Sequence, residues 1–257
     1  MNIIITAGGT TEPIDSVRSI TNTSTGMLGS LIANAFAKIS NTEKIYYICG
    51  KTAVIPPSDK TEIILADTAA NLGTAVKKVI ATDSIDIIIH SMAVSDYRVK
   101  SITSASMLAA SVQSGLPLLQ ADTIQMGDDL VRSLIENPET ILNDDGKISS
   151  NIDDLILYME RTPKIISLFQ TLAPKAILVG FKLLDHVPQE TLIDTAFHLL
   201  QDNKCKFVLA NDLRDISKEQ HIGYLIDESK NYKRYTTKTE IAAAIAAVTT
   251  EIRRKIR

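Results

Sequence analysis

The residues with the clearest potential for chemistry follow the first apolar segment of the sequence, residues 2–6. That segment leads into a loop with Gly8, Gly9 and Thr10, and a proline and several Thr, Ser and Asn residues separate this loop from the first expected helix, near Gly26. Glycines allow backbone amides to approach an anion, and threonine hydroxyls add hydrogen-bond donors. A helix that begins near Gly26 directs the positive end of its dipole toward the same loop. The loop is therefore predicted to bind phosphate groups.

Two common nucleotide-binding signatures are absent from the sequence: the dinucleotide fingerprint Gly-x-Gly-x-x-Gly and the Gly-Lys-Ser/Thr of a P-loop. The second expected strand ends in Gly50, Lys51 and Thr52, where a NAD site would place an acidic residue for the ribose. Tyr47 and Lys51 have the spacing of the Tyr-x-x-x-Lys pair of short-chain dehydrogenases, but they lie at a strand end rather than on a helix. A NAD(P)-dependent reductase is thus a disfavoured alternative.

The composition is typical of a cytoplasmic protein. The 257 residues carry a formal net charge of −3, so neither nucleic acid nor a membrane is an expected partner. No apolar run reaches the ~18 residues that span a bilayer, and the first residues lack the pattern of a signal peptide. The two cysteines, Cys49 and Cys205, form no metal set and are expected in the core.

Apolar strands alternate with amphipathic helices along the chain, which predicts an α/β fold: a Rossmann-like, mostly parallel sheet with helices on both faces. A small β-hairpin and a final helix are expected to close the chain. The strands are expected at residues 2–6, 44–49, 62–66, 85–90, 176–181 and 207–210, and the hairpin at 223–226 and 232–235. The helices are expected at residues 27–38, 69–81, 128–136, 163–172, 189–203 and 239–254.

Polar residues follow several of these strands, and ligands of such sheets bind at the carboxyl ends of the strands. Asp96, Asn211 and Asp212 are in such positions, although each could instead cap a helix or form a turn. His90 also ends an apolar strand. It has no second His or Cys at ligand spacing, so it is interpreted as a structural histidine.

A group of motifs resembles the phosphopantothenate–cysteine ligase family. They occur in the family's order and cover nearly the whole chain, and the first one is long enough to be specific. The motifs are residues 8–15 (GGTTEPID), 17–18 (VR), 20–26 (ITNTSTG), 93–97 (AVSDY), 147–150 (KISS), 162–164 (TPK), 180–183 (GFKL) and 210–212 (AND).

The resemblance implies an enzyme of coenzyme A biosynthesis that joins 4′-phosphopantothenate to L-cysteine. The family activates the pantothenate carboxylate with a nucleoside triphosphate, CTP in bacterial members and often ATP in eukaryotic ones, and an acyl-nucleotide is the intermediate. The resemblance also implies Mg²⁺, a homodimer, and a separate phosphopantothenoylcysteine decarboxylase that acts next. A nucleotide-binding regulatory module without turnover is the other alternative.

Matched to the family motifs, Gly8, Gly9 and Thr10 would bind the nucleotide phosphates. Asn22 would hold the pantothenate carboxyl group, because an amide donates to a carboxylate without adding charge. Lys147 would act in catalysis from a mobile segment. Further nucleotide contacts are expected from Asp96, Phe181, Asn211 and Asp212, and further substrate contacts from Ser24, Thr25 and Gly26.

The sequence also departs from the family pattern. Residues 24–29 (STGMLG) lack the lysine that many bacterial members have at the start of the helix, and residues 147–150 resemble the eukaryotic form. The interval between Asp96 and Lys147 is longer than in bifunctional members. Residues 1–257 are therefore expected to form one ligase domain with an insertion or lid near 98–151, in which Asp144, Asp145 and Gly146 favour a turn.

Overall fold

The computed structural model of the chain describes residues 1–115, 129, 132–136, 141–142, 146–217 and 220–256. The chain divides into two compact units. The first unit comprises residues 1–10, 22–94 and 163–257, and the second comprises residues 11–21 and 95–162. The expectation of a single ligase domain with a lid stays a prediction.

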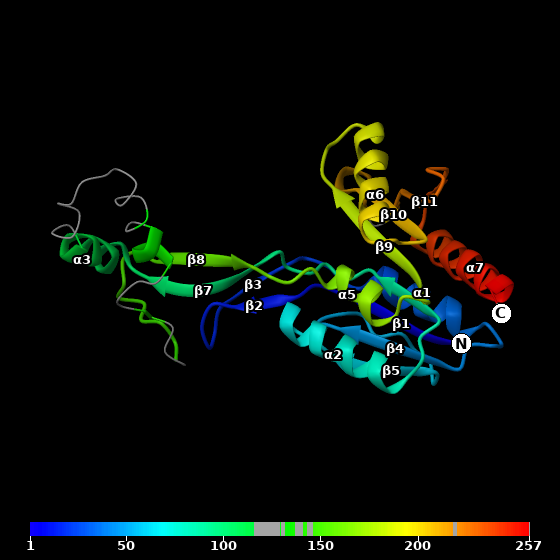
Figure 1. Cartoon of the computed structure of the whole chain (residues 1–257), viewed down its shortest axis with the longest axis horizontal. Coiled ribbons are helices and arrows are strands. Elements are labelled where there is room, and N and C mark those ends of the chain that lie inside the picture. The colour runs from blue at the N-terminus through cyan, green and yellow to red at the C-terminus, as the bar shows by residue number, and fades with distance from the viewer. Residues whose placement is uncertain (116–128, 130–131, 137–140, 143–145, 218–219, 257) are drawn as a thin grey trace. The chain divides into compact units, whose positions relative to one another are not determined.

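An eight-stranded sheet forms the centre of the first unit (Figure 1). Its strand order is β12-β11-β10-β9-β6-β1-β4-β5. The strands from β10 to β5 in this order pair in parallel, whereas β11 and β12 are antiparallel. This is the mostly parallel, Rossmann-like sheet with a C-terminal hairpin that the sequence predicts. The strands are β1 (Asn2–Ala7), β4 (Lys44–Cys49), β5 (Thr61–Leu65), β6 (Ile87–His90), β9 (Ile177–Leu184), β10 (Phe207–Asp212), β11 (Gly223–Asp227) and β12 (Tyr232–Tyr235).

Helices cover both faces of this sheet, as predicted. Alternate residues of each inner strand face opposite sides, so that Ile4 and Ile88 belong to one apolar cluster and Ile3 and Ile89 to the other. The first cluster is covered by α2 (Ala69–Thr82), α5 (Ile165–Leu172) and α6 (Gln189–Asp202), and the second by α1 (Met27–Ala37) and α7 (Lys238–Ile256). Cys49 and Cys205 are buried free thiols in these clusters, which confirms their expected core position.

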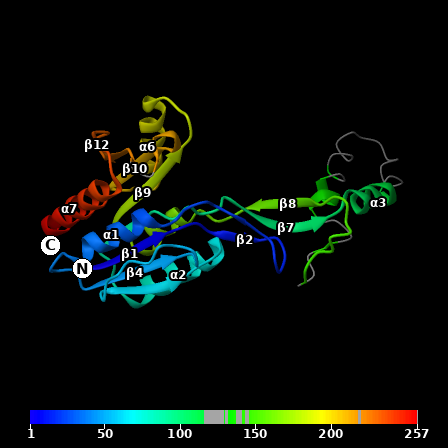
Figure 2. The same cartoon turned by 180° about the vertical axis from the view of Figure 1, so that it is seen from behind.

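The second unit contains two antiparallel strand pairs. The longer pair is β7 (Tyr97–Thr103) with β8 (Ile156–Arg161), which lie side by side in Figures 1 and 2. The shorter pair is β2 (Thr11–Pro13) with β3 (Ser19–Thr21). Helix α3 (Ala105–Gly115) follows β7. Residues 129 and 132–136 are helical where a helix is predicted, whereas residues 128, 130 and 131 of that prediction lie outside the described part of the chain.

The sequence did not predict these two strand pairs or α3. Strands β2 and β3 have three residues each and lie in a segment rich in Thr and Ser, so they are too short for a period-two pattern. Strands β7 and β8 are joined by no tight turn, because more than fifty residues separate Thr103 from Ile156. The usual hairpin signal is therefore absent.

His90 is a structural residue, as predicted. Its Nδ1 atom lies 2.8 Å from the Oγ1 atom of Thr6, and its ring meets the ring of Phe169 edge to face at 5.3 Å between centroids. Burial lowers the pKa of His90 from its ordinary 6.5 to about 4. The imidazole is therefore neutral in the folded protein near pH 7.

We expect the stability of the fold to fall between pH 6.5 and pH 4. A lowered histidine pKa means that the unfolded chain binds a proton more readily, so His90 stabilises the fold fully above pH 6.5 and loses this effect, up to about 3 kcal/mol, as the pH falls to about 4. Urea unfolding at a series of pH values measures the slope. His90→Gln should make the slope shallower, and His198→Gln, an exposed change on α6, should not. An unchanged slope in His90→Gln would refute this source of the pH dependence.

Candidate functional site

The candidate site in the first unit lies where the connections of the sheet reverse direction. Strand β1 pairs with β4 on one side and β6 on the other, and open α/β sheets form a ligand crevice at the carboxyl ends of such strands. Gly8 and Gly9 follow β1, Gly50 follows β4, and Ala93 lies shortly after β6. A bridge between Gly9 and Ala93 extends the pairing of β1 and β6 beyond the strands.

Three glycines allow the loop after β1 and the start of α1 to touch. Gly8 and Gly26 have positive φ values of 83° and 69°, which residues other than glycine rarely adopt. A Cβ atom on Gly26 would lie 3.1 Å from the Gly8 nitrogen, and one on Gly9 would lie 2.0 Å from the Asn22 carbonyl oxygen. Gly26 caps α1 without a side-chain hydrogen bond to the first turn. The predicted phosphate loop and the positive end of α1 are therefore adjacent.

Asn22 is held against this loop by backbone hydrogen bonds. Its N–H donates to the Thr10 carbonyl at 3.2 Å, and Thr10 N–H donates to the Ala93 carbonyl at 3.0 Å. The Asn22 side chain is half-buried, and its Nδ2 donates to the same Ala93 carbonyl at 3.3 Å. An amide nitrogen has two N–H groups. The second N–H of Asn22 Nδ2 makes no hydrogen bond with the described residues, so it can donate to another acceptor. The structure thus brings together Gly8, Gly9, Thr10, Asn22 and Gly26.

Tyr47 supports this arrangement in a way that sequence reasoning missed. Its hydroxyl lies 2.9 Å from the Val54 carbonyl oxygen and 3.3 Å from the Gly26 carbonyl oxygen. The Val54 N–H in turn donates to the Thr25 carbonyl at 2.9 Å. Thr25 and Ser24 lie in the link between Asn22 and α1, where Thr25 is exposed and Ser24 half-buried. A tyrosine in a strand carries no sequence signal for such a contact.

Asn211 and Asp212 are engaged by the protein's own backbone. The buried Asn211 amide donates to the Ile222 carbonyl at 2.7 Å. The Asp212 carboxylate accepts N–H groups from His186 and Val187, at 3.1 and 3.0 Å, and from Arg214. Burial by itself would raise the pKa of Asp212, but these hydrogen bonds and the Arg214 charge lower it overall. Both side chains shape the carboxyl end of β10, and their contact with a nucleotide stays a prediction.

The remaining predicted site residues are spread over the chain. Phe181 on β9 is half-buried and packs against the cluster under α1 and α7. Asp96 and Lys147 belong to the second unit, and both are exposed. Ile148, directly after Lys147, is only 5% exposed, so the lysine has a buried apolar neighbour that the lid interpretation did not include. Residues 143–145, part of the predicted lid turn, lie outside the described residues.

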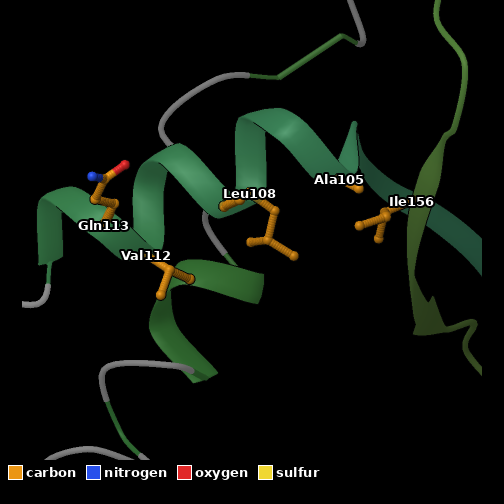
Figure 3. Close-up of a pocket in the computed structure, with 6 residues that line it drawn as sticks. Ala105, Leu108, Val112, Gln113 and Ile156 are labelled. Atoms are coloured by element: carbon orange, nitrogen blue, oxygen red, sulfur yellow. The ribbon is translucent and has the colours of Figure 1, made fainter.

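The second unit also contains an apolar pocket of about 400 Å³ between α3 and β8 (Figure 3). None of the predicted site residues lines it, and its one polar side chain in the described part of the chain is Gln113. Such a lining offers no cation to a polyphosphate. The pocket is lined by Ala105, Leu108, Ala109, Val112, Gln113 and Ile156.

No helix among the described residues is both long and apolar enough to cross a membrane. The same residues contain no group of three or more His, Cys, Asp or Glu side chains that could hold a metal ion.

Comparisons with known proteins match nearly the whole chain. The family model described as "DNA/pantothenate metabolism flavoprotein C-terminal domain" matches residues 1–132 and 138–252. The crystal structure of the DNA/pantothenate metabolism flavoprotein from Streptococcus pneumoniae is 32% identical and has a TM-score of 0.78, over 98% of this chain and 99% of that one.

Two further known proteins are similar at lower identity. The coenzyme A biosynthesis bifunctional protein CoaBC of Thermococcus kodakarensis is 28% identical over 93% of this chain and 48% of its own length. The chain therefore spans about half the length of that relative. A Cab2 variant in complex with phosphopantothenate-cysteine shares the fold, with a TM-score of 0.66 and 18% identity over 99% of this chain and 86% of that one.

Proposed function

Because the chain belongs to the family of DNA/pantothenate metabolism flavoprotein C-terminal domains, we propose that it ligates 4′-phosphopantothenate to L-cysteine in coenzyme A biosynthesis. The names of two relatives support this proposal: one is a bifunctional protein of coenzyme A biosynthesis, and the other was solved with phosphopantothenate-cysteine. The observation that carries the proposal is the Asn22 amide beside the glycine loop and the start of α1. In this arrangement, a hydrogen-bond donor for a carboxylate lies next to donors for a phosphate.

The first chemical step forms the acyl-nucleotide. A carboxylate oxygen of phosphopantothenate attacks the α-phosphorus of the triphosphate, the bond to the bridging oxygen breaks, and pyrophosphate leaves with that electron pair. Both reactants are anions, so donors must offset their repulsion where charge develops. Backbone amides near Gly8, Gly9 and Gly26 serve the phosphates, and the free N–H of Asn22 serves the carboxylate. Lys147 supplies a cation to the phosphates.

The second step forms the amide bond. The amine of L-cysteine attacks the acyl carbon, the nucleoside monophosphate leaves, and the amine loses a proton. The carboxyl group of cysteine stays in the product, and the proposed next enzyme, a decarboxylase, would remove it. That this decarboxylase is a separate protein, and that the ligase is a homodimer, stay predictions.

The proposed co-substrate is a nucleoside triphosphate, CTP or ATP, and CTP is expected to work at least as well as ATP. Mg²⁺ is proposed as the counter-ion of the triphosphate. It would neutralise phosphate charge. Asp96, Phe181, Asn211 and Asp212 are proposed at the nucleotide, and Ser24, Thr25 and Gly26 at the substrate.

The products of a single assay test this function. We expect phosphopantothenate, cysteine, Mg²⁺ and CTP to yield phosphopantothenoylcysteine, CMP and pyrophosphate, and ATP to work no better than CTP. With ¹⁸O in the pantothenate carboxylate, mass spectrometry should find one labelled oxygen in CMP, because that oxygen attacks phosphorus. Release of CDP and orthophosphate would contradict an acyl-nucleotide. Nucleotide binding without any product would favour the regulatory module.

A further inference from the structure

The turn between β2 and β3 contains a buried carboxylate. The side chain of Asp15 is 2% exposed. It accepts backbone N–H groups of Val17 and Arg18 at 2.9 and 2.8 Å, and the guanidinium of Arg18 donates to it through Nε and Nη2 at 3.0 and 2.5 Å. The Arg18 hydrogen bond is the main reason that the pKa of Asp15 lies well below its ordinary value. The carboxylate is therefore ionised across the pH range in which enzymes usually work.

This ion pair also holds a residue that is distant in sequence. The backbone N–H of Ile148 donates to Asp15 Oδ2 at 3.1 Å, and the Ile148 carbonyl accepts Arg18 Nη2 at 3.2 Å. Both backbone groups of Ile148 are thus bound by one pair of side chains, and the Ile148 side chain is buried at 5% exposure. All of these contacts lie within the second unit. Lys147 immediately precedes Ile148, so its backbone leads directly into this clamp, which consists of Asp15, Arg18 and the backbone of Ile148.

We propose that Asp15 and Arg18 are positioning residues that fix the backbone at Ile148 and thereby aim the side chain of Lys147. The proposal rests on the proposed function, because Lys147 is assigned a catalytic role only there. A backbone fixed at its amide and its carbonyl has little freedom to rotate, which limits the directions that the preceding side chain can take. A flexible lysine loses entropy when it binds phosphate, and a fixed backbone reduces that cost.

The chemistry of the clamp depends on the carboxylate charge. Arg18 is 42% exposed, and an ion pair open to water contributes little by itself. The Asp15 carboxylate is buried and accepts more than this ion pair. Four N–H donors within the turn and a fifth from Ile148 converge on it. If an amide replaces the Asp15 carboxylate, some of these N–H donors face the NH₂ group of the amide and lose their acceptor. A buried donor without an acceptor destabilises the fold.

Asp15→Asn tests this inference by two independent measurements. Hydrogen exchange of a peptide covering residues 146–152 should become faster by about tenfold or more, because the Ile148 amide loses its acceptor. Turnover should fall between about 10- and 100-fold, the effect of a misplaced catalytic group. Asp153→Asn, an exposed carboxylate in the same unit with no hydrogen bond among the described residues, should change neither quantity.

A double-mutant cycle separates positioning from a general structural role. If Asp15 acts through Lys147, adding Asp15→Asn to Lys147→Gln should lower turnover no further. Effects that multiply would overturn the proposal, and so would unchanged exchange at residues 146–152 in Asp15→Asn. If Asp15→Asn does not fold, Arg18→Lys serves instead, because it keeps the charge but removes the planar guanidinium by which Arg18 binds both Asp15 and the Ile148 carbonyl.

The exchange measurement distinguishes this proposal from the proposed function. It needs no substrate, so a wild-type protein without ligase activity would refute the function and still report whether the clamp holds Ile148. Conversely, normal ligase activity with slow, unchanged exchange in Asp15→Asn would refute the clamp alone.

Discussion

Asn22→Asp should lower turnover by at least about 10²–10³-fold while the protein stays folded. Loss of one well-placed donor to a reacting oxygen has an effect of this size. The substitution is nearly isosteric, but it replaces the N–H groups of the amide by a second anion. That anion would face both the Ala93 carbonyl, 3.3 Å from Nδ2 in the native protein, and the carboxylate of the substrate. Like charges at such a site disfavour binding and activation together.

The measurement must separate chemistry from the local fold, because the Asn22 backbone also holds Thr10. Turnover per folded molecule, with the folded fraction taken from a thermal melt, makes that separation. Asn71→Asp is the matched control, since Asn71 is exposed on α2 and its side chain makes no hydrogen bond with the described residues, whereas its backbone N–H donates to Thr68 Oγ1. A variant at Asn22 that melts earlier but keeps native turnover per folded molecule would assign Asn22 to loop structure alone.

The ordered loop residues were predictable because their constraints are local. Gly8, Gly9 and Gly26 occur where backbone segments approach one another closely. Because glycine has no side chain, its occurrence in a sequence indicates where such an approach is possible. The β-sheet was predictable for the same reason, since runs such as Ile3, Ile4 and Ile5 form buried strands in any parallel arrangement. Periodicity therefore predicted the sheet of the first unit, and glycine placement predicted the close contacts of the loop after β1; phosphate binding by that loop stays a prediction.

Contacts between distant residues were not predictable in this way. Asp15 and Ile148 are 133 positions apart, and neither segment carries a sequence pattern that predicts contact with the other. Asn211 and Asp212 were predicted as ligand groups because they follow an apolar segment, but the sequence did not show that their side chains also bind backbone groups around Ile222 and Val187. Asn and Asp serve both purposes, and the contact of these two residues with a nucleotide stays a prediction.

Lys147→Gln should lower turnover by about 10²–10³-fold, the second large effect that we expect. Glutamine keeps the length and polarity of the side chain but removes the charge that pairs with phosphate, and an ammonium in a water-poor site interacts far more strongly than one on the surface. The fold should be unaffected, because Lys147 is exposed and Ile148, which Asp15 and Arg18 hold, is unchanged. Lys175→Gln, an exposed lysine before β9, is the control for loss of charge alone.

Hydrogen exchange gives this last prediction a second readout. The Ile148 amide already donates to Asp15 without a ligand, so its protection should be the same in wild type and Lys147→Gln. Added protection on nucleotide binding is expected at Gly146 and Lys147, where no hydrogen bond from the described residues holds the backbone, and Lys147→Gln should abolish it. Equal exchange at Gly146 and Lys147 with and without nucleotide in the wild-type protein would show that Lys147 belongs to a static surface segment, and a fully active Lys147→Gln would remove it from the reaction.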